Sequence, residues 1–179
     1  MRQAPDNRIE VRLRELGQLF NMMDPSPFID QDLDADAEEF IVSWARELPH
    51  HRELELVIHL SAAPDPALAS GVQDAVQHYF TSRVVIKQRE LRLLLRRGRA
   101  SLLIGVVFLA GCFALGEVAQ GLLPQGWNEF TELGLHIVGW VAMWRPLETY
   151  LYDWWPVRGD LHLLQRLARM RVRVQPTVA

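Results

Sequence analysis

The sequence of 179 residues contains one cysteine, Cys112, and one lysine, Lys87. A single thiol excludes an intramolecular disulfide and any metal site built from several cysteines. The glycine-rich phosphate-binding motifs, the HExxH zinc motif and the GxSxG nucleophile motif are also absent from the sequence. We therefore expect no cofactor and no metal site, and we predict that the protein is not an enzyme.

Basic residues are missing over a long internal stretch, because no lysine or arginine lies between Ala100 and Trp144. Residues 101–123 (SLLIGVVFLAGCFALGEVAQGLL) hold a single carboxylate, Glu117. A hydrocarbon core of about 30 Å needs roughly 20 mainly apolar residues at 1.5 Å each. These residues are therefore predicted to form a transmembrane helix.

A second span is predicted over residues 130–152, after a short turn at 124–129. Its apolar run ends at Arg145, so the helix reaches membrane length only if it continues to about Tyr152. Pro146 is expected to kink it, since proline lacks a backbone donor and clashes with the preceding turn. The alternative is a re-entrant or interfacial segment.

The basic residues flank these two spans, and this distribution predicts their orientation. They are Lys87, Arg89, Arg92, Arg96, Arg97 and Arg99 before the first span, and Arg145, Arg158, Arg166, Arg169, Arg171 and Arg173 at or after the end of the second. Basic residues near span ends stay in the cytoplasm. We therefore predict a helical hairpin with both termini cytoplasmic; no secretory signal is expected.

Aromatic and basic residues at the span ends are expected to meet the lipid headgroups. Trp127 belongs to the outer turn by this reasoning, and the predicted cytoplasmic headgroup contacts are Arg96, Arg97, Arg99, Trp154 and Trp155. The isoelectric point of about 6.1 argues against nucleic acid as a partner. Membrane lipids are the expected partners of the basic clusters.

The remaining residues predict a small cytosolic α+β domain of the βαβ type. Strands are expected at Ile9–Leu13, for which a helix is the alternative, and at Glu53–Leu60. A helix over Ala37–Glu47 lies between them, and a helical turn is expected at 16–21. Met170–Val174 alternates apolar and basic residues, so it is a possible third strand. The predicted divisions are a cytosolic domain and stalk (1–98), the transmembrane hairpin (99–155) and a cytosolic amphipathic tail (156–179).

The acidic run at 29–39 has no glycine or bidentate glutamate at the positions that a calcium loop requires, so helix capping is the preferred interpretation. Asp36 and Glu39 have the spacing of a capping box. The helix that follows is expected to present one apolar side, which consists of Phe40, Ile41, Trp44 and Leu48.

The helices next to the membrane are predicted from their end signals. Asp65 is suited to cap a helix that begins at Pro66, with Gly71 or Gly98 as possible interruptions. Residues 152–160 are expected to turn the chain. An amphipathic helix from Asp160 then follows, whose apolar side lies against the inner leaflet or the cytosolic domain.

Two sets of ionisable residues stand out in the spans. Glu117 and His136 are each six residues from the outer end of a span, so they are expected at one depth, about 9 Å from it. They form either one interhelical hydrogen bond or a proton relay or ion site. Arg145 and Glu148 are three apart, which indicates an ion pair at the cytoplasmic boundary or, in an oligomer, a mouth for an anionic solute.

The stretch LFNMMDPSPFIDQDLDADAEEFIVSWARELP, the segment ELELVIHL and the two apolar spans occur in that order. In this order the chain resembles small uncharacterised bacterial inner-membrane proteins, and the resemblance implies a location and an architecture but no activity. We expect an accessory or scaffolding protein whose cytosolic domain docks a partner or self-associates, as a homo-oligomer or a subunit of a membrane complex. The alternative is a homo-oligomeric channel or transporter.

Overall fold

The computed structural model describes residues 7–49, 52–61, 66–122 and 124–176, without the side chains of 66–70, 120–122 and 125–128. The chain divides into two compact units. The first combines Met1–Gln88 with Gly159–Ala179, and the second is Arg89–Arg158. Helices α2 (Pro66–Leu122) and α4 (Trp154–Leu167) contribute residues to both. Each unit is considered by itself below.

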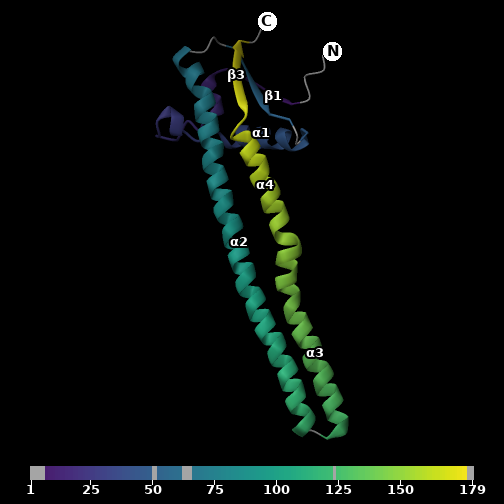
Figure 1. The fold of residues 1–179 in the computed structure, drawn as a ribbon. Coiled ribbons are helices and arrows are strands. Elements are labelled where there is room, and N and C mark those ends of the chain that lie inside the picture. Colours follow the sequence, from purple (N-terminus) through teal and green to yellow (C-terminus); the bar gives the residue numbers. More distant parts are fainter. Residues whose placement is uncertain (1–6, 50–51, 62–65, 123, 177–179) are drawn as a thin grey trace. The chain divides into compact units, whose positions relative to one another are not determined.

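The first unit is built on a parallel sheet with the order β1-β2-β3. Its strands are β1 (Arg8–Leu13), β2 (Glu55–Leu60) and β3 (Arg171–Pro176) (Figure 1). In register, Arg8 lies opposite Glu55, and Glu55 lies opposite Arg171. The predicted βαβ unit and the predicted third strand are both confirmed.

One face of the sheet carries the core of the first unit. Side chains alternate along each strand, so Ile9, Leu56 and Ile58 share this face and are fully buried. Helix α1 (Ala35–Glu47), the N-terminal part of α2 and the C-terminal part of α4 all contribute residues to the same core. Both crossovers step in the same direction across the sheet, so the usual right-handed connection puts every helix on one side.

The start of α1 corrects the predicted capping box. The cap is Asp34, whose carboxylate accepts hydrogen bonds from the amides of Asp36 at 3.1 Å and Ala37 at 3.3 Å. The helix therefore begins at Ala35, two residues before the predicted start. An aspartate was the expected cap type, but several acids follow one another here and spacing alone selected the wrong one.

The buried side of α1 also differs from the prediction. Ile41 and Ala45 are fully buried, whereas Phe40 is 40% exposed and Trp44 47% exposed. Residues four apart lie above one another on a helix, so the 41/45 row faces the sheet and Phe40 and Trp44 lie beside it. The expectation that Phe40 and Trp44 belong to the buried face was therefore wrong.

The long connection from β1 to α1, residues 14–34, contains two short 3₁₀ turns. After β1, a 3₁₀ turn at Leu16–Leu19 confirms the predicted helical turn and buries Leu16 and Leu19. A second 3₁₀ turn spans Phe28–Asp30. The Phe28 ring packs against that of Phe20, with 4.9 Å between the centroids.

Helix α2 begins at Pro66 as predicted, whereas the predicted cap Asp65 lies outside the described residues. Neither Gly71 nor Gly98 interrupts it. A Cβ at Gly98 would lie 3.0 Å from Cγ2 of Thr149, so this glycine permits close approach of the neighbouring segment rather than a break. Among the described residues one helix, Gly71–Ala119, is long and apolar enough to cross a membrane, by length and composition.

Helix α3 (Gln125–Glu148) starts earlier than predicted. The expected turn at 124–129 shrinks, because Pro124 is the N-cap and helical geometry begins at Gln125. Pro124 has the extended ψ of an N-cap, and the low helix propensity of Gly126 and Asn128 does not prevent the helix from starting here. Pro146 lies inside α3 without ending it.

The chain stays helical after α3, and this corrects the predicted turn at 152–160. A π-helical segment, η3 (Thr149–Asp153), follows Pro146 and leads directly into α4. The Thr149 amide donates to the carbonyls of both Arg145 and Pro146. Pro156 lies in the first turn of α4, where proline is tolerated. The helix therefore continues through the segment that was predicted to turn.

The C-terminal part of α4 is the predicted amphipathic helix. Leu163, Leu164 and Leu167 are buried in the core of the first unit, and Leu161 packs against that core. Of the two surfaces proposed for this apolar side, the structure therefore selects the α/β domain.

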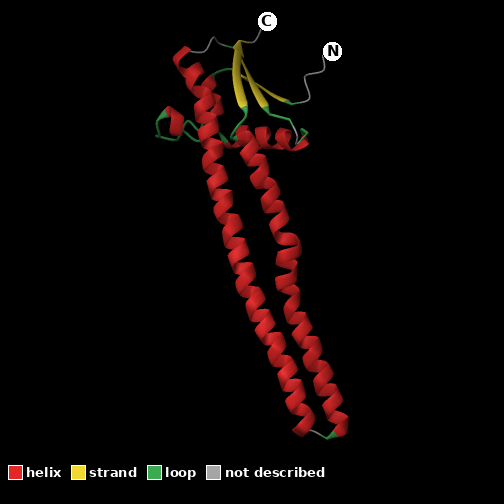
Figure 2. Cartoon of the chain, in the orientation of Figure 1, coloured by secondary structure: helices red, strands yellow, loops and turns green. Residues whose placement is uncertain are grey.

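In the second unit, α2 and α3 run in opposite directions side by side (Figure 2). A Cβ at Gly105 would lie 3.3 Å from Cγ of Pro146, and one at Gly139 would lie 3.3 Å from Cβ of Cys112 and 2.7 Å from Cδ1 of Leu109. Gly105 and Gly139 thus permit close packing of the two helices, whereas nothing lies within 4 Å of a Cβ added at Gly134.

Candidate functional site

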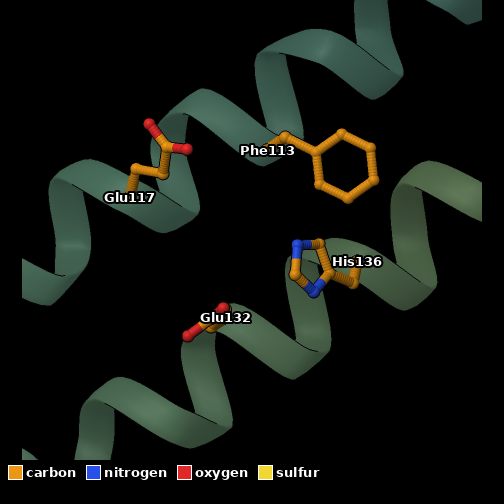
Figure 3. A pocket seen from close by; sticks show the side chains of 4 residues that line it. All are labelled: Phe113, Glu117, Glu132 and His136. Atoms are coloured by element: carbon orange, nitrogen blue, oxygen red, sulfur yellow. The ribbon is translucent and has the colours of Figure 1, made fainter.

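A polar pocket opens between α2 and α3 of the second unit, within the stretch that lacks basic residues. It has a volume of about 590 Å³ and is lined by Phe113, Glu117, Glu132 and His136 (Figure 3). Each helix supplies two residues four apart, which lie on the same side of a helix. The antiparallel arrangement then brings the two pairs to one place.

The predicted partners Glu117 and His136 both line this pocket, but no hydrogen bond or ion pair joins these two described side chains. The His136 ring instead contacts the Phe113 ring edge to face, with 4.6 Å between the centroids. The Glu117 carboxylate is exposed on α2. The two groups thus share a pocket without the direct contact that a simple proton relay needs.

Glu132 is a pocket residue that the sequence analysis missed. A Cβ at Gly116 would lie 3.7 Å from its Cγ, so the close approach of the helices at Gly116 places Glu132 beside α2. The available signal was the spacing of four between Glu132 and His136, which puts both on one side of α3. The pocket therefore holds two carboxylates and an imidazole.

The carboxylates and the imidazole that line this pocket are common types of metal ligand. Across the described residues, no group of three His, Cys, Asp or Glu side chains is arranged to hold a metal ion. The arrangement supports proton or water contact in the pocket and gives no geometry for a metal site.

Arg145 and Glu148 form the expected ion pair near the end of α3. Nη1 of Arg145 lies 3.0 Å from Oε2 of Glu148, and the arginine side chain is largely exposed. An exposed pair at this spacing contributes only a few tenths of a kcal/mol, about 0.2–0.5. It therefore fixes side-chain orientation more than stability.

Arginines of α2 line two shallow surface pockets in the second unit. Arg89, Arg92 and Arg96 surround Leu93 in a cavity of about 430 Å³. Arg97 lines another, of about 290 Å³, with Glu90 and Asp153. Arg99, the last predicted headgroup residue before the apolar stretch, is exposed.

The tryptophans predicted to lie at the membrane interface differ in their contacts and in their exposure. Nε1 of Trp154 donates to the Tyr150 carbonyl at 2.7 Å, and the Arg158 guanidinium lies 5.5 Å from its ring centroid. Trp155 is exposed and packs edge to face on Trp154. The side chain of Trp127 lies outside the described residues.

In the first unit, a carboxylate joins α1 to α2. Glu38 accepts a hydrogen bond from the Tyr79 hydroxyl at 2.7 Å and pairs with the Arg83 guanidinium at 2.7 Å. Burial, followed by this hydrogen bond, raises the pKa of Tyr79. Burial opposes the charge of Arg83, but the hydrogen bond to Glu38 together with the acidic groups around the guanidinium outweighs it and raises the pKa of Arg83.

The second face of the sheet is charged. The Glu55 carboxylate, 13% exposed, lies between Arg8 at 2.6 Å and Arg173 at 2.9 Å. Farther along, Nε2 of His59 lies 3.7 Å from Oε2 of Glu10. Parallel sheets are usually covered on both faces, yet all three helices with residues in the core pack on the other one. Among the described residues no helix packs on this charged face, although Val57 within it is only 4% exposed.

Comparisons with protein-family models, with curated proteins and with solved structures found no match for this chain.

Proposed function

We propose that the chain is an integral protein of the bacterial inner membrane that serves as an accessory or scaffolding subunit without catalytic activity. The observation that carries this proposal is the exposed apolar surface of the second unit. Only 17% of the most apolar 18-residue window of α2 is buried within the protein. The core helix of a soluble protein would be mostly buried, so this surface fits lipid better than water.

Helix α3 extends the same surface. Its exposed large apolar residues are Phe130, Leu133, Ile137, Val138, Trp140, Val141, Trp144 and Leu147. In the proposed arrangement, residues 101–123 and 130–152 form a transmembrane hairpin with both termini in the cytoplasm. The arginines on either side then lie where basic residues are retained, and Arg96, Arg97 and Arg99 meet the headgroups.

The accessory role is supported by the α/β unit. Its core is closed by three helices on one face, and no described helix packs on its charged face, which is the surface proposed to receive a protein partner or a second copy. The described part of the chain offers no arrangement for nucleophilic or metal-assisted catalysis. A membrane-tethered docking domain accounts for both features.

Membrane insertion is tested first by extraction at alkaline pH and then by cysteine labelling of the full chain. The background is Cys112→Ser, which removes the native thiol. A cysteine at Glu129 should react with an impermeant maleimide on intact spheroplasts, and a cysteine at Arg158 only after lysis. Release of the chain at alkaline pH, or labelling of Arg158→Cys before lysis, would refute the proposed topology.

A homo-oligomeric channel or transporter is a second candidate, favoured by the pocket at Glu117, Glu132 and His136. Two spans cannot enclose a pore, so this function requires several copies around the polar residues. Native mass spectrometry of the gently solubilised protein separates the two. A closed ring of identical chains favours the channel, whereas a stoichiometric foreign protein or a simple dimer favours the scaffold.

A further inference from the structure

Strand β1 forms one edge of the sheet, and its outward backbone groups are identifiable. The Asn7 carbonyl accepts a hydrogen bond from the Glu55 amide, and the Leu13 carbonyl accepts one from Ser61, each at 3.1 Å. Backbone groups alternate in direction along a strand. The amides and carbonyls of Arg8, Glu10 and Arg12 therefore point away from β2, toward an edge with which no described element pairs.

The side chains of this edge are also incompletely covered. On the core face, Val11 and Leu13 are only partly buried, in contrast to Ile9, which is completely buried. On the charged face, the Glu10 side chain is 45% exposed and Arg12 is exposed. The edge thus offers two apolar side chains on one face and alternating charges on the other.

We propose that two copies of the chain associate through their β1 strands, paired antiparallel about a two-fold axis at Val11. This proposal rests on the scaffolding function and names the partner as a second copy. In this register Glu10 lies opposite Arg12 of the second copy, and the two residues exchange backbone hydrogen bonds. Val11 lies opposite Val11, and Ile9 lies opposite Leu13. Each dimer gains two opposite-charge pairs and extends the apolar layer beneath them.

Other antiparallel registers of β1 are poorer. An axis at Glu10 places Glu10 opposite Glu10 and Arg8 opposite Arg12, which repel each other. An axis at Arg12 places two arginines together. An axis at Ile9 would set Arg8 opposite Glu10 of the second copy, but Arg8 already binds Glu55 at 2.6 Å. In that register Leu13 would have no partner within β1. The axis at Val11 also sets Arg8 opposite Arg14, which lies just beyond the end of β1, but the charge of Arg8 is already matched by Glu55 at 2.6 Å. Charge and burial within β1 together select this axis.

The opposite edge, β3, is protected against the same association. Its Arg171 amide donates to the Leu54 carbonyl, so Val172, Val174 and Pro176 are the outward residues. An axis at Val172 or at Arg173 sets arginines opposite each other, and an axis at Val174 sets Val172 opposite Pro176, which has no amide to donate. Pairing through β1 alone gives a closed dimer rather than a fibre.

The register is tested by disulfide scanning in the full-length Cys112→Ser chain, with single cysteines at Ile9, Glu10, Val11 and Arg12. Residues opposite one another in a non-hydrogen-bonded pair have Cα atoms about 4.5 Å apart, within the range of a disulfide. Oxidation of membranes should therefore give a covalent dimer chiefly with Val11→Cys. A dimer formed best at Ile9, Glu10 or Arg12, or at none of the four, overturns the proposed register.

A charge exchange tests the same contact without relying on a half-buried cysteine. Glu10→Arg and Arg12→Glu should each weaken the dimer about tenfold in sedimentation of the detergent-solubilised chain, because each creates two like-charge pairs. The double variant should restore it. Single variants that dimerise like the parent, or assemblies larger than a dimer, contradict the proposal.

Alkaline extraction of every variant keeps the two hypotheses apart. Chains that remain in the membrane but never dimerise refute the β1 contact and leave the membrane proposal intact. Chains that are extracted refute membrane integration itself.

Discussion

The two units of this chain use similar apolar residues in opposite ways. In the first unit, Ile9, Ile58, Phe80 and Leu167 are completely buried among helices and a sheet. In the second, Cys112 is the only buried member of the described apolar side chains that is not proline or glycine. Composition therefore does not show which apolar residues are buried. A pair of helices encloses too little volume to bury large side chains, so those of the second unit stay exposed.

The same comparison separates two kinds of helix contact. The first unit closes with large side chains, whereas the second brings its helices together at glycines and leaves its large side chains outside. Small residues at the contact are typical of helices packed in lipid, where association depends on close backbone approach. The four predictions that follow are ordered by the size of the expected effect.

The largest effect is expected from emptying the core of the first unit. Phe80→Ala should destabilise it by about 3–5 kcal/mol, because Phe80 is completely buried. The measurement is hydrogen exchange of the β2 amides in the detergent-solubilised full chain. Phe130→Ala is the matched change in the second unit, where the ring is 77% exposed, and it should change this protection by less than about 0.5 kcal/mol. Equal losses of protection in the two variants would contradict the difference between the two units.

Placing a charge on the apolar surface of α2 should oppose membrane insertion. Val107→Arg should cost about 2.5–3.5 kcal/mol of insertion free energy if residue 107 lies at the centre of a span. Insertion is measured as the fraction of chain that resists alkaline extraction. The matched control is Val85→Arg on the same helix, where Val85 is a partly exposed residue of the first unit. An unchanged fraction for Val107→Arg would contradict a span at this position.

Enlarging Gly139 should loosen the helix pair of the second unit. A Cβ there meets Leu109 at 2.7 Å, so Gly139→Val should cost about 1–3 kcal/mol through overpacking. Cys112 is buried at this contact, so a thiol-reactive dye reports its exposure during heating. Gly134→Val is the control, since nothing lies within 4 Å of its added Cβ. Identical melting of the two variants would argue against close packing at Gly139.

The smallest effect is expected in the exposed loop before α1. The Asp24 carboxylate accepts backbone hydrogen bonds from Asp32 at 2.8 Å and Ser26 at 3.0 Å, which lower its pKa. Its contribution to stability is therefore complete above the unfolded value of 3.8 and is lost as the pH falls through the lower folded pKa. Asp24→Asn should destabilise the unit slightly at pH 6 and lose this difference in stronger acid, as measured by hydrogen exchange. A difference that grows in acid would contradict this sign.

The sequence predicted the strands well because side chains alternate along each of them. The alternation of Ile9, Val11 and Leu13 with charged neighbours was a stronger signal than the helical spacing of Leu13, Leu16 and Phe20, and each of the three strands lies within two residues of its expected position. The helix cap was less predictable. Asp34 and Asp36 have the same chemistry, and only the backbone geometry distinguishes them.

Other differences arose because single residues were given too much weight. Pro156 and Gly159 suggested a turn, yet the helix passes through both, since a proline in the first turn of a helix loses little. The pocket between α2 and α3 was only half predicted. Glu117 and His136 were found from their depth, whereas Glu132 depends on the close approach of Gly116, which no single-helix pattern reveals.

The sheet order has a consequence for biosynthesis. Strands β1 and β2 leave the ribosome early, but β3 follows about 110 residues after β2, when the whole second unit has already been made. At a translation rate of roughly 20 residues per second, this delay lasts several seconds. During that time the backbone amides of β2 that face β3 have no strand with which to form hydrogen bonds. The nascent domain therefore exposes an unpaired strand edge until translation is almost finished. Chaperone contact with nascent chains should therefore concentrate on β2 and decline only after residue 176 has emerged.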